Sequence, residues 1–364
     1  MIKLLIGTVV LILAGCAGVA PRQKMEQDLE RVRQELARTP FLAEKWAFPL
    51  GERIERAWWV GTDLLVEASS PPGAPGSLLN LHCFNGKDGI ISWTFGLSHA
   101  LDSPPAGNRS FFYLLVEGEL FLLRRESGAL VSRVSLPFSP SSPAVAGDRH
   151  LWIGGWDKFL YTLDPENGKK EWRHLAKGDL TAPVFSGEGR VIFGAEDGCW
   201  QSLEADSGQT AWSEQLGGAL RFAPVRDQDR LAVASDDMNV YLRHFPSGTP
   251  KAYFTLQSRP AAPPVLAGNQ LLQATETREL QIFSLDQGPG PKARIPGCVG
   301  YLMTGKKFYY ALGTGQEIIR IDPQTLQVVD TTRWHGLAPW NANPELGLLV
   351  AVSSAGTLLV AEER

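Results

Sequence analysis

Cysteine is scarce in this sequence, and its spacing excludes the common structural metal sites. The chain has four cysteines, and no two of them are adjacent or stand in a Cys-x-x-Cys pattern. Tetrahedral zinc sites usually require such closely spaced pairs. If the first cysteine, Cys16, is modified, three remain, and at least one of these must stay unpaired in an oxidising compartment. We expect Cys83, Cys199 and Cys298 to be buried as small apolar side chains.

The sequence also lacks an excess of positive charge. It carries 35 Lys and Arg residues against 39 Asp and Glu residues, so its formal net charge is -4. The basic residues are scattered and form nothing longer than pairs such as Lys169-Lys170. Nucleic-acid-binding proteins instead present a basic face to the phosphates. The composition therefore predicts that nucleic acid is not a partner.

A long apolar run occurs only at the start of the chain, and it is too short to span a bilayer as a mature helix. Lys3 precedes the apolar stretch Leu4–Ala14, which leads into Leu13-Ala14-Gly15-Cys16. One positive charge, about a dozen apolar residues and small residues before the cleavage site are typical of a signal peptide. The tetrapeptide is similar to a bacterial lipobox, in which the cysteine becomes the acylated first residue. We therefore predict a signal peptide over residues 1–15 and lipidation of Cys16; the alternative is an ordinary signal peptide with an incidental cysteine.

The residue after this cysteine bears on the destination of the lipoprotein. Ala17 stands there, where an Asp commonly retains lipoproteins in the inner membrane. We therefore expect the protein in the cell envelope, at the periplasmic face of the outer membrane. Because two or more acyl chains anchor a protein stably, the body would sit at the membrane surface without crossing it.

A short amphipathic helix is predicted between the anchor and the main domain. Residues 16–43 form the expected lipid-anchored linker, and apolar residues recur at helical spacing within Gln23–Thr39, at Met25, Leu29, Val32 and Leu36. Such a helix is either a docking element or spacer for a partner, or it packs on the side of the main domain.

No catalytic constellation is evident. The acidic pairs fall in expected turns, and no EF-hand loop is present. The histidines are scattered without an ordered Ser or Cys partner: they are His82, His99, His150, His174, His244 and His335. These observations predict a protein that is not an enzyme and that needs no metal or cofactor.

An internal repeat of about 40 residues organises the remaining chain. Its clearest unit is Leu160–Trp172, and Leu203–Trp212 repeats the second half of that unit. Alternating apolar residues around a tight turn indicate a β-hairpin. Eight polar residues mark the same place in successive units: Asn85, Arg124, Asp164, Glu204, His244, Asp286, Asp322 and Glu362. Eight units with about four short strands each predict an all-β fold, an eight-bladed β-propeller over residues 44–364.

Three further residue types keep step with this register. Glycine stands four positions after six marks, where a turn with positive φ favours it: Gly89, Gly128, Gly168, Gly208, Gly248 and Gly290, with Leu326 breaking the pattern. Tryptophan stands eight positions after three marks, where its ring can pack between blades: Trp93, Trp172 and Trp212, against Ser132, Ala252, Arg294 and Asp330 elsewhere. Proline precedes four expected innermost strands, where a missing N–H costs little: Pro143, Pro183, Pro224 and Pro264.

The two ends of the chain predict how the ring closes. The last unit stops after Leu358–Glu362 and has no outer strand of its own. Trp46–Leu50 is similar to the segment that begins at Trp172, but no hairpin precedes it. We predict that this N-terminal strand completes the last blade, which removes an open seam with unpaired strand edges.

The hairpins Leu163–Trp172 and Leu203–Trp212 resemble the repeat of the pyrroloquinoline-quinone-type propellers, which reads roughly Ala-Leu-Asp-x-x-Thr-Gly-x-x-x-Trp. With the lipobox and eight units, the chain resembles the BamB-like outer-membrane assembly lipoproteins. This resemblance covers the architecture of nearly the whole chain, although only two units match the repeat closely. It implies a non-enzymatic scaffold that binds a protein partner, a component of the β-barrel assembly machinery.

In that family the partner is contacted by loops that enter the innermost strands on one face. Here these loops include Gly178–Thr181 and Gly218–Arg221. The resemblance therefore implies four exposed contact residues: Asp179, Leu180, Leu220 and Arg221.

Two other functions remain open on the sequence. A quinone-dependent dehydrogenase shares the repeat, and the resemblance implies that it would need an adjacent Cys-Cys pair, calcium ligands and inserted substrate loops. This chain has no adjacent cysteines, and eight units of about 40 residues leave no length for such insertions. A ligand-binding propeller for a carbohydrate, a peptide or a quinone would gather aromatic rings at its central funnel. The candidates for such rings are Trp156, Trp200 and Trp340.

Overall fold

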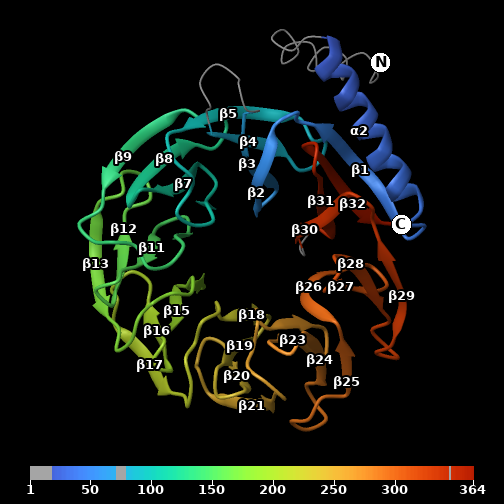
Figure 1. The fold of residues 1–364 in the computed structure, drawn as a ribbon. Coiled ribbons are helices and arrows are strands. Elements are labelled where there is room, and N and C mark those ends of the chain that lie inside the picture. The colour runs from blue at the N-terminus through green and yellow to red at the C-terminus, as the bar shows by residue number, and fades with distance from the viewer. Residues whose placement is uncertain (1–18, 71–78, 344–345) are drawn as a thin grey trace.

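The computed structural model describes residues 19–70, 79–343 and 346–364, and these fold into thirty-two strands and one helix. The strands form eight four-stranded antiparallel sheets, arranged as blades around a closed ring (Figure 1). The predicted eight-bladed propeller is confirmed. The predicted signal peptide and the lipidation site Cys16 lie outside the described residues.

In each of the first seven blades the strands follow chain order from the axis to the rim. The first blade comprises β2 (Arg53–Val60), β3 (Asp63–Ser69), β4 (Leu79–Asn85) and β5 (Ile91–Leu97). The second comprises β6 (Ala106–Gly107), β7 (Phe111–Val116), β8 (Glu119–Arg124) and β9 (Leu130–Ser135). The third comprises β10 (Val145–Ala146), β11 (Leu151–Gly154), β12 (Phe159–Leu163) and β13 (Lys170–Leu175). The fourth comprises β14 (Phe185–Gly187), β15 (Arg190–Gly194), β16 (Cys199–Glu204) and β17 (Thr210–Gln215).

The other four blades repeat this plan, and the last one recruits the N-terminal strand. The fifth comprises β18 (Val225–Asp227), β19 (Arg230–Ser235), β20 (Asn239–His244) and β21 (Pro250–Thr255). The sixth comprises β22 (Val265–Ala267), β23 (Gln270–Thr275), β24 (Glu279–Ser284) and β25 (Ala293–Pro296). The seventh comprises β26 (Cys298–Thr304), β27 (Tyr309–Gly313), β28 (Glu317–Ile321) and β29 (Val328–Arg333). The eighth comprises β30 (Leu337–Asn343), β31 (Leu348–Ser353), β32 (Thr357–Glu363) and β1 (Leu42–Pro49).

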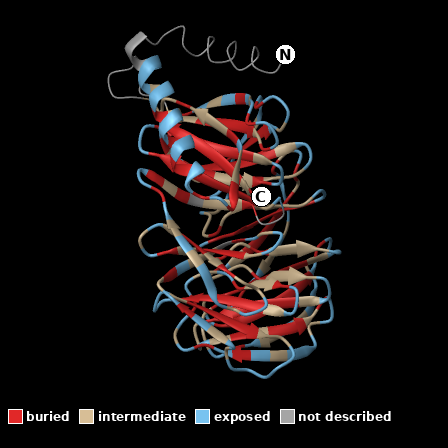
Figure 2. Ribbon diagram, turned by 90° about the vertical axis from the view of Figure 1, so that its right-hand side faces the viewer, coloured by how far each residue is buried: buried red, intermediate tan, exposed pale blue. Residues whose placement is uncertain are grey.

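The position of each strand in its blade explains its residues. Second and third strands are covered by neighbouring blades on both faces, and the inner strands of the blades are largely buried (Figure 2). β11 and β16, for example, are almost continuously buried. Outermost strands such as β13 and β17 instead alternate between exposed and half-buried residues. The apolar core is therefore a series of clusters between blades, and each blade is stabilised by its neighbours.

Tryptophan rings pack across four of the seams, the interfaces between neighbouring blades, as the register predicts. Each ring comes from an outermost strand and lies against a glycine of the next blade, and a Cβ atom added to that glycine would lie 2.4–2.8 Å from the ring: the pairs are Trp46/Gly89, Trp93/Gly128, Trp172/Gly208 and Trp212/Gly248. Each indole nitrogen also donates a hydrogen bond to a backbone carbonyl of that blade, over 2.8–3.2 Å. Glycine is required here both for its space and for its positive φ.

The glycine prediction is wrong at one place. Gly290 does not have a positive φ; Gly288 does, with φ 78°. The turn from β24 to β25 spans residues 285–292 and is longer than the turns between β16 and β17 or between β20 and β21, so the register slips. Leu326 breaks the sequence pattern but keeps the backbone conformation, with φ 59°.

The ring closes as predicted. β1 pairs with β32 in antiparallel register from Leu42 opposite Glu363 to Pro49 opposite Thr357. β1 begins at Leu42, two residues before the expected boundary of the domain. The pairing joins the two ends of the described chain in one sheet, and it covers the edge of β32 that would otherwise be unpaired.

The N-terminal helix packs against the eighth blade (Figure 1). This helix, α2 (Val19–Ala37), starts earlier than predicted and ends shortly before Pro40. Val32 and Leu36 are buried in a cluster with residues of the seventh and eighth blades, whereas Met25 and Leu29 are half-buried. Of the two alternatives left by the sequence, the structure shows the packed helix. No helix in the described part of the chain is both long and apolar enough to cross a bilayer.

Asp28 fixes α2 to the turn before β32. Its carboxylate accepts hydrogen bonds of 2.5 Å from the hydroxyls of Ser353 and Thr357, and it pairs with Arg31 at 2.5 Å. Burial alone would raise the pKa of this carboxyl, but the hydroxyl groups and the guanidinium outweigh burial and lower the pKa below its ordinary value.

We predict that this contact weakens in acid. Because folding lowers the pKa of Asp28, its contribution to stability is present above the unfolded pKa and is lost as pH falls through the folded pKa. As pH falls below about 4, the free energy of unfolding of the wild type should fall more steeply than that of Asp28→Asn. Urea denaturation at several pH values measures both slopes, and parallel profiles would contradict the assignment.

Candidate partner-binding face

One face of the ring carries the loops that cross from the outermost strand of one blade to the innermost strand of the next; we call it the crossover face. The turns between second and third strands lie on the same face, because a backbone N–H of each turn donates to the preceding crossover loop in four successive blades. The bonds span 2.9–3.0 Å and join Trp156 to Ser139, Glu196 to Asp179, Asp236 to Ala219, and Glu276 to Arg259. The crossover loops are therefore held in a repeated and defined conformation.

The structure contradicts the expectation that Leu180 and Leu220 are exposed. Leu180 is 2% exposed and Leu220 is 0% exposed. Each side chain covers the end of a second strand in the preceding blade, where Gly154 and Gly194 leave the room. A Cβ atom on Gly194 would lie 2.4 Å from Leu220. The two leucines therefore hold the loops in place and are not available as surface contacts.

The two charged residues of the same loops do reach the surface. The Asp179 side chain is 38% exposed and lies 4.0 Å from the Lys158 ammonium group. The Arg221 side chain is 53% exposed, and its guanidinium donates a 2.8 Å hydrogen bond to Asp236. This hydrogen bond and the charge of Asp236 raise the pKa of Arg221. Exposed ion pairs of this kind contribute little to stability, so both side chains are free to serve recognition.

Two large apolar side chains flank these charges and were not chosen from the sequence as protein contacts. Trp156, in the turn of the third blade, is 58% exposed, and Met238, in the turn of the fifth blade, is 45% exposed. With Asp179, Arg221 and Asp236 they form what we call the crossover patch. Two repeats of about 40 residues separate Trp156 from Asp236, so the sequence indicates that both lie in equivalent turns. The repeat does not show, however, which side chains in those turns are exposed.

The structure argues against a funnel lined by the three named tryptophans. Trp200 is fully buried, at 0% exposure, because it packs between the fourth and fifth blades against Trp212. Trp156 lies on the crossover face, and the side chain of Trp340 lies outside the described part of the structure. Among the described residues, no three His, Cys, Asp or Glu side chains are placed to hold a metal ion.

The cysteines behave as the sequence predicts. Cys83, Cys199 and Cys298 are free and buried. Burial raises the pKa of the Cys83 and Cys298 thiols to about 12. Both thiols are therefore protonated at neutral pH and are not nucleophiles.

The sequence matches a family described as outer membrane protein assembly factor BamB over residues 116–332, which is more than half of the chain. One member, the outer membrane protein assembly factor BamB of Nitrosomonas eutropha, is 25% identical over 91 residues, which are 25% of this chain and 22% of that protein. The quinoprotein alcohol dehydrogenase PedH of Pseudomonas putida is 33% identical over 67 residues, which are 18% of this chain and 11% of that enzyme. The chain thus spans less than a quarter of the length of either curated relative.

A solved structure matches the fold far more completely. The crystal structure of BamB from Moraxella catarrhalis superimposes with a TM-score of 0.71 at 15% sequence identity. The match covers 89% of this chain and 98% of that one. At this level of identity the likeness establishes a shared fold.

Proposed function

This chain belongs to the family of the outer membrane protein assembly factor BamB, and on that basis we propose that it is a non-enzymatic envelope lipoprotein that acts as a protein-binding scaffold. Its role is in the assembly of outer-membrane β-barrel proteins, and its partner is a component of the barrel-assembly machinery. The family match over residues 116–332 is the observation that carries this proposal. Cys16 anchors the protein at the periplasmic face of the outer membrane.

The crossover patch is the proposed contact surface. Interfaces draw most of their binding energy from a few aromatic and arginine anchors that become desolvated, with methionine also enriched. The patch offers Trp156 on the third blade, Arg221 in the loop between the fourth and fifth blades, and Met238 on the fifth blade. Asp179 and Asp236 complete it. Its loops are braced by buried leucines and repeated backbone hydrogen bonds, so little conformational entropy is lost when a partner binds.

The likeness to quinoprotein dehydrogenases supports a shared repeat and does not extend to their activity. The match to PedH spans 67 residues, which is less than two repeat units of this chain. A dehydrogenase relative would also be expected to carry an adjacent cysteine pair, and the sequence has none. The scaffold is therefore the better supported function.

We expect reversal of the charges on the crossover patch to disrupt partner binding. The double variant Asp179→Lys/Arg221→Glu should recover about tenfold less barrel-assembly protein than the wild type, because unlike charges across the interface become like charges. The measurement is affinity purification of the full-length lipoprotein from membranes, with quantitative mass spectrometry of the outer-membrane proteins that accompany it.

Lys169→Glu is the matched control. Lys169 is exposed in the turn between β12 and β13, on the opposite face of the ring, and the change reverses one charge without touching the patch. It should leave recovery unchanged. Equal recovery from the double variant and the wild type would reject the patch, and absence of a barrel-assembly protein from the wild-type sample would reject the scaffold role.

A further inference from the structure

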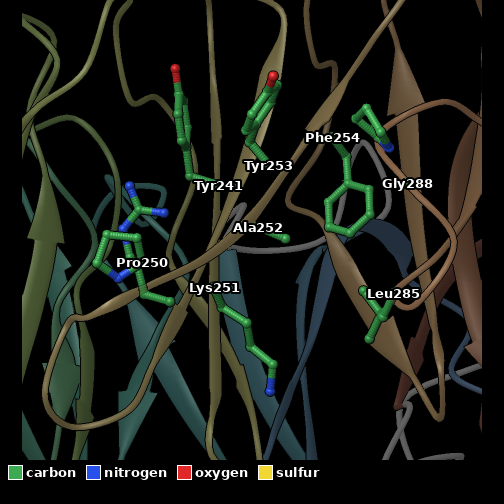
Figure 3. A pocket seen from close by; sticks show the side chains of 10 residues that line it. Tyr241, Pro250, Lys251, Ala252, Tyr253, Phe254, Leu285 and Gly288 are labelled. Carbon is green, nitrogen blue, oxygen red and sulfur yellow. The ribbon is translucent and has the colours of Figure 1, made fainter.

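An open cavity of about 490 Å³ lies at the rim of the ring, around β21 (Figure 3). Its volume is in the range of about 300–1,000 Å³ that is usual for ligand sites. The fifth blade contributes residues of β20 and β21, and the sixth blade contributes residues of the long turn after β24. On the side of the sixth blade the cavity is lined by Ala252 and Phe254 of β21 and by Leu285, Gly288 and Pro289 of the long turn. Tyr241 and Arg243 of β20 line its other side, toward the fourth blade.

Ala252 occupies the place that tryptophan holds in four other blades. Ala252 lies opposite Leu242 in the β20/β21 pair, as Trp212 lies opposite Ser202 in the β16/β17 pair. Both outermost residues stand eight positions after the register mark of their blade. At the seam between the fifth and sixth blades the fastening ring is therefore replaced by a methyl group.

In the described part of the chain, the glycines of the sixth blade against which such a ring would pack, Gly288 and Gly290, have no side chain over them. A Cβ atom on Gly248 would lie 2.5 Å from the Trp212 ring at the previous seam. By contrast, no atom of the described residues lies within 4 Å of a Cβ atom added to Gly288 or to Gly290. The space that an indole fills elsewhere is open here.

The neighbouring structure holds this space open. The backbone N–H of Thr255 donates a 3.1 Å hydrogen bond to the carbonyl of Pro289, which ties the long turn of the sixth blade to β21. Phe254 is 1% exposed and forms a fixed apolar wall. In Figure 3 the Phe254 and Leu285 side chains lie on one side of the short Ala252 side chain, whereas Tyr253, 56% exposed, stands next to Tyr241.

We propose that this opening, the rim slot, binds a tryptophan side chain carried by an extended segment of another polypeptide. The same fold selects an indole at four other seams, where the ring packs on glycine and its N–H finds a backbone carbonyl. The rim slot offers comparable apolar walls without a ring of its own, so an incoming tryptophan buries its surface there without displacing any residue of the chain. The slot lies on the rim, apart from the crossover patch, so the inference does not depend on the proposed function.

The test uses a peptide taken from this chain as the probe. A fluorescein-labelled octapeptide with the sequence of residues 209–216 carries the equivalent of Trp212 in its native context. Titrated with the full-length protein in detergent, it should bind with a dissociation constant of about 10⁻⁴ M, measured by fluorescence anisotropy. The same peptide with Ala in place of Trp should bind at least about tenfold more weakly.

Filling the slot from within should block it. In Ala252→Trp the protein's own indole occupies the slot, so peptide binding should weaken at least about tenfold. The melting temperature should rise, because the added ring buries apolar surface. Val131→Trp is the control, because it adds an indole to the exposed outer strand β9 and should leave both quantities unchanged. If Ala252→Trp melts below the wild type, the smaller Ala252→Leu replaces it, with the same expected loss of binding. Unchanged peptide affinity in the blocked variant, or equal affinity for the Trp and Ala peptides, would overturn the proposal.

Discussion

Replacing Trp46 by alanine should lower the free energy of unfolding by about 3–5 kcal/mol, the usual cost of removing a buried tryptophan. Trp46 is 6% exposed; its ring stacks on Phe84 with centroids 5.7 Å apart, and its indole N–H donates a 3.0 Å hydrogen bond to the Gly86 carbonyl. The residue lies in β1, the strand that closes the ring, and it packs against the first blade. Trp46→Ala therefore weakens the closing seam itself. Urea denaturation followed by far-ultraviolet circular dichroism measures the loss.

Trp156→Ala is the matched control for this experiment. Trp156 is 58% exposed, so its removal should change the free energy of unfolding by less than about 0.5 kcal/mol. The pair compares the same substitution at a seam and at the surface. Similar losses for the two variants would mean that the Trp46 seam does not carry the stability assigned to it.

Leu220→Ala should cost about 2–5 kcal/mol of unfolding free energy, although it lies in a surface loop. Its side chain is 0% exposed and packs with Ile192, Trp200 and Leu231 between the fourth and fifth blades. Alanine would leave a cavity there and release the loop that presents Arg221. Differential scanning calorimetry should show a clearly lowered melting temperature.

Arg221→Ala is the neighbouring control. Its guanidinium is half exposed and makes one surface ion pair with Asp236, so its loss should cost less than about 1 kcal/mol. The contrast also governs how binding data are interpreted, because a defect in Leu220→Ala reports a displaced loop, whereas a defect in Arg221→Ala reports a lost contact. Equal stability of Leu220→Ala and Arg221→Ala would contradict the packing of Leu220 between the fourth and fifth blades.

Part of the candidate site could be identified from the sequence. The family resemblance implied that Asp179 and Arg221 are exposed contact residues in crossover loops; both are at the surface, and their role as contacts stays a prediction. The same reasoning failed for Leu180 and Leu220, because the sequence does not show which residues of the neighbouring blade cover an apolar side chain in a loop. The room for them is made by Gly154 and Gly194, which lie in the preceding blade, 26 residues earlier in the chain.

The sequence alone determined the number of blades and the way the ring closes. Both depend on local signals that recur every 40 residues or so: the alternation of apolar residues within a hairpin, glycine at a turn with positive φ, and a last unit without its outer strand. Such signals act within one unit and need no knowledge of the neighbouring blade.

Only the tertiary structure decided what lies between blades. It placed α2 on the eighth blade, buried the two loop leucines, and left the rim slot open beside Ala252. Each of these depends on how closely two units approach and on whether a turn, such as residues 285–292, is long enough to reach the neighbouring strand. Side-chain volumes on both sides of a seam set that fit, and no single repeat contains both sides.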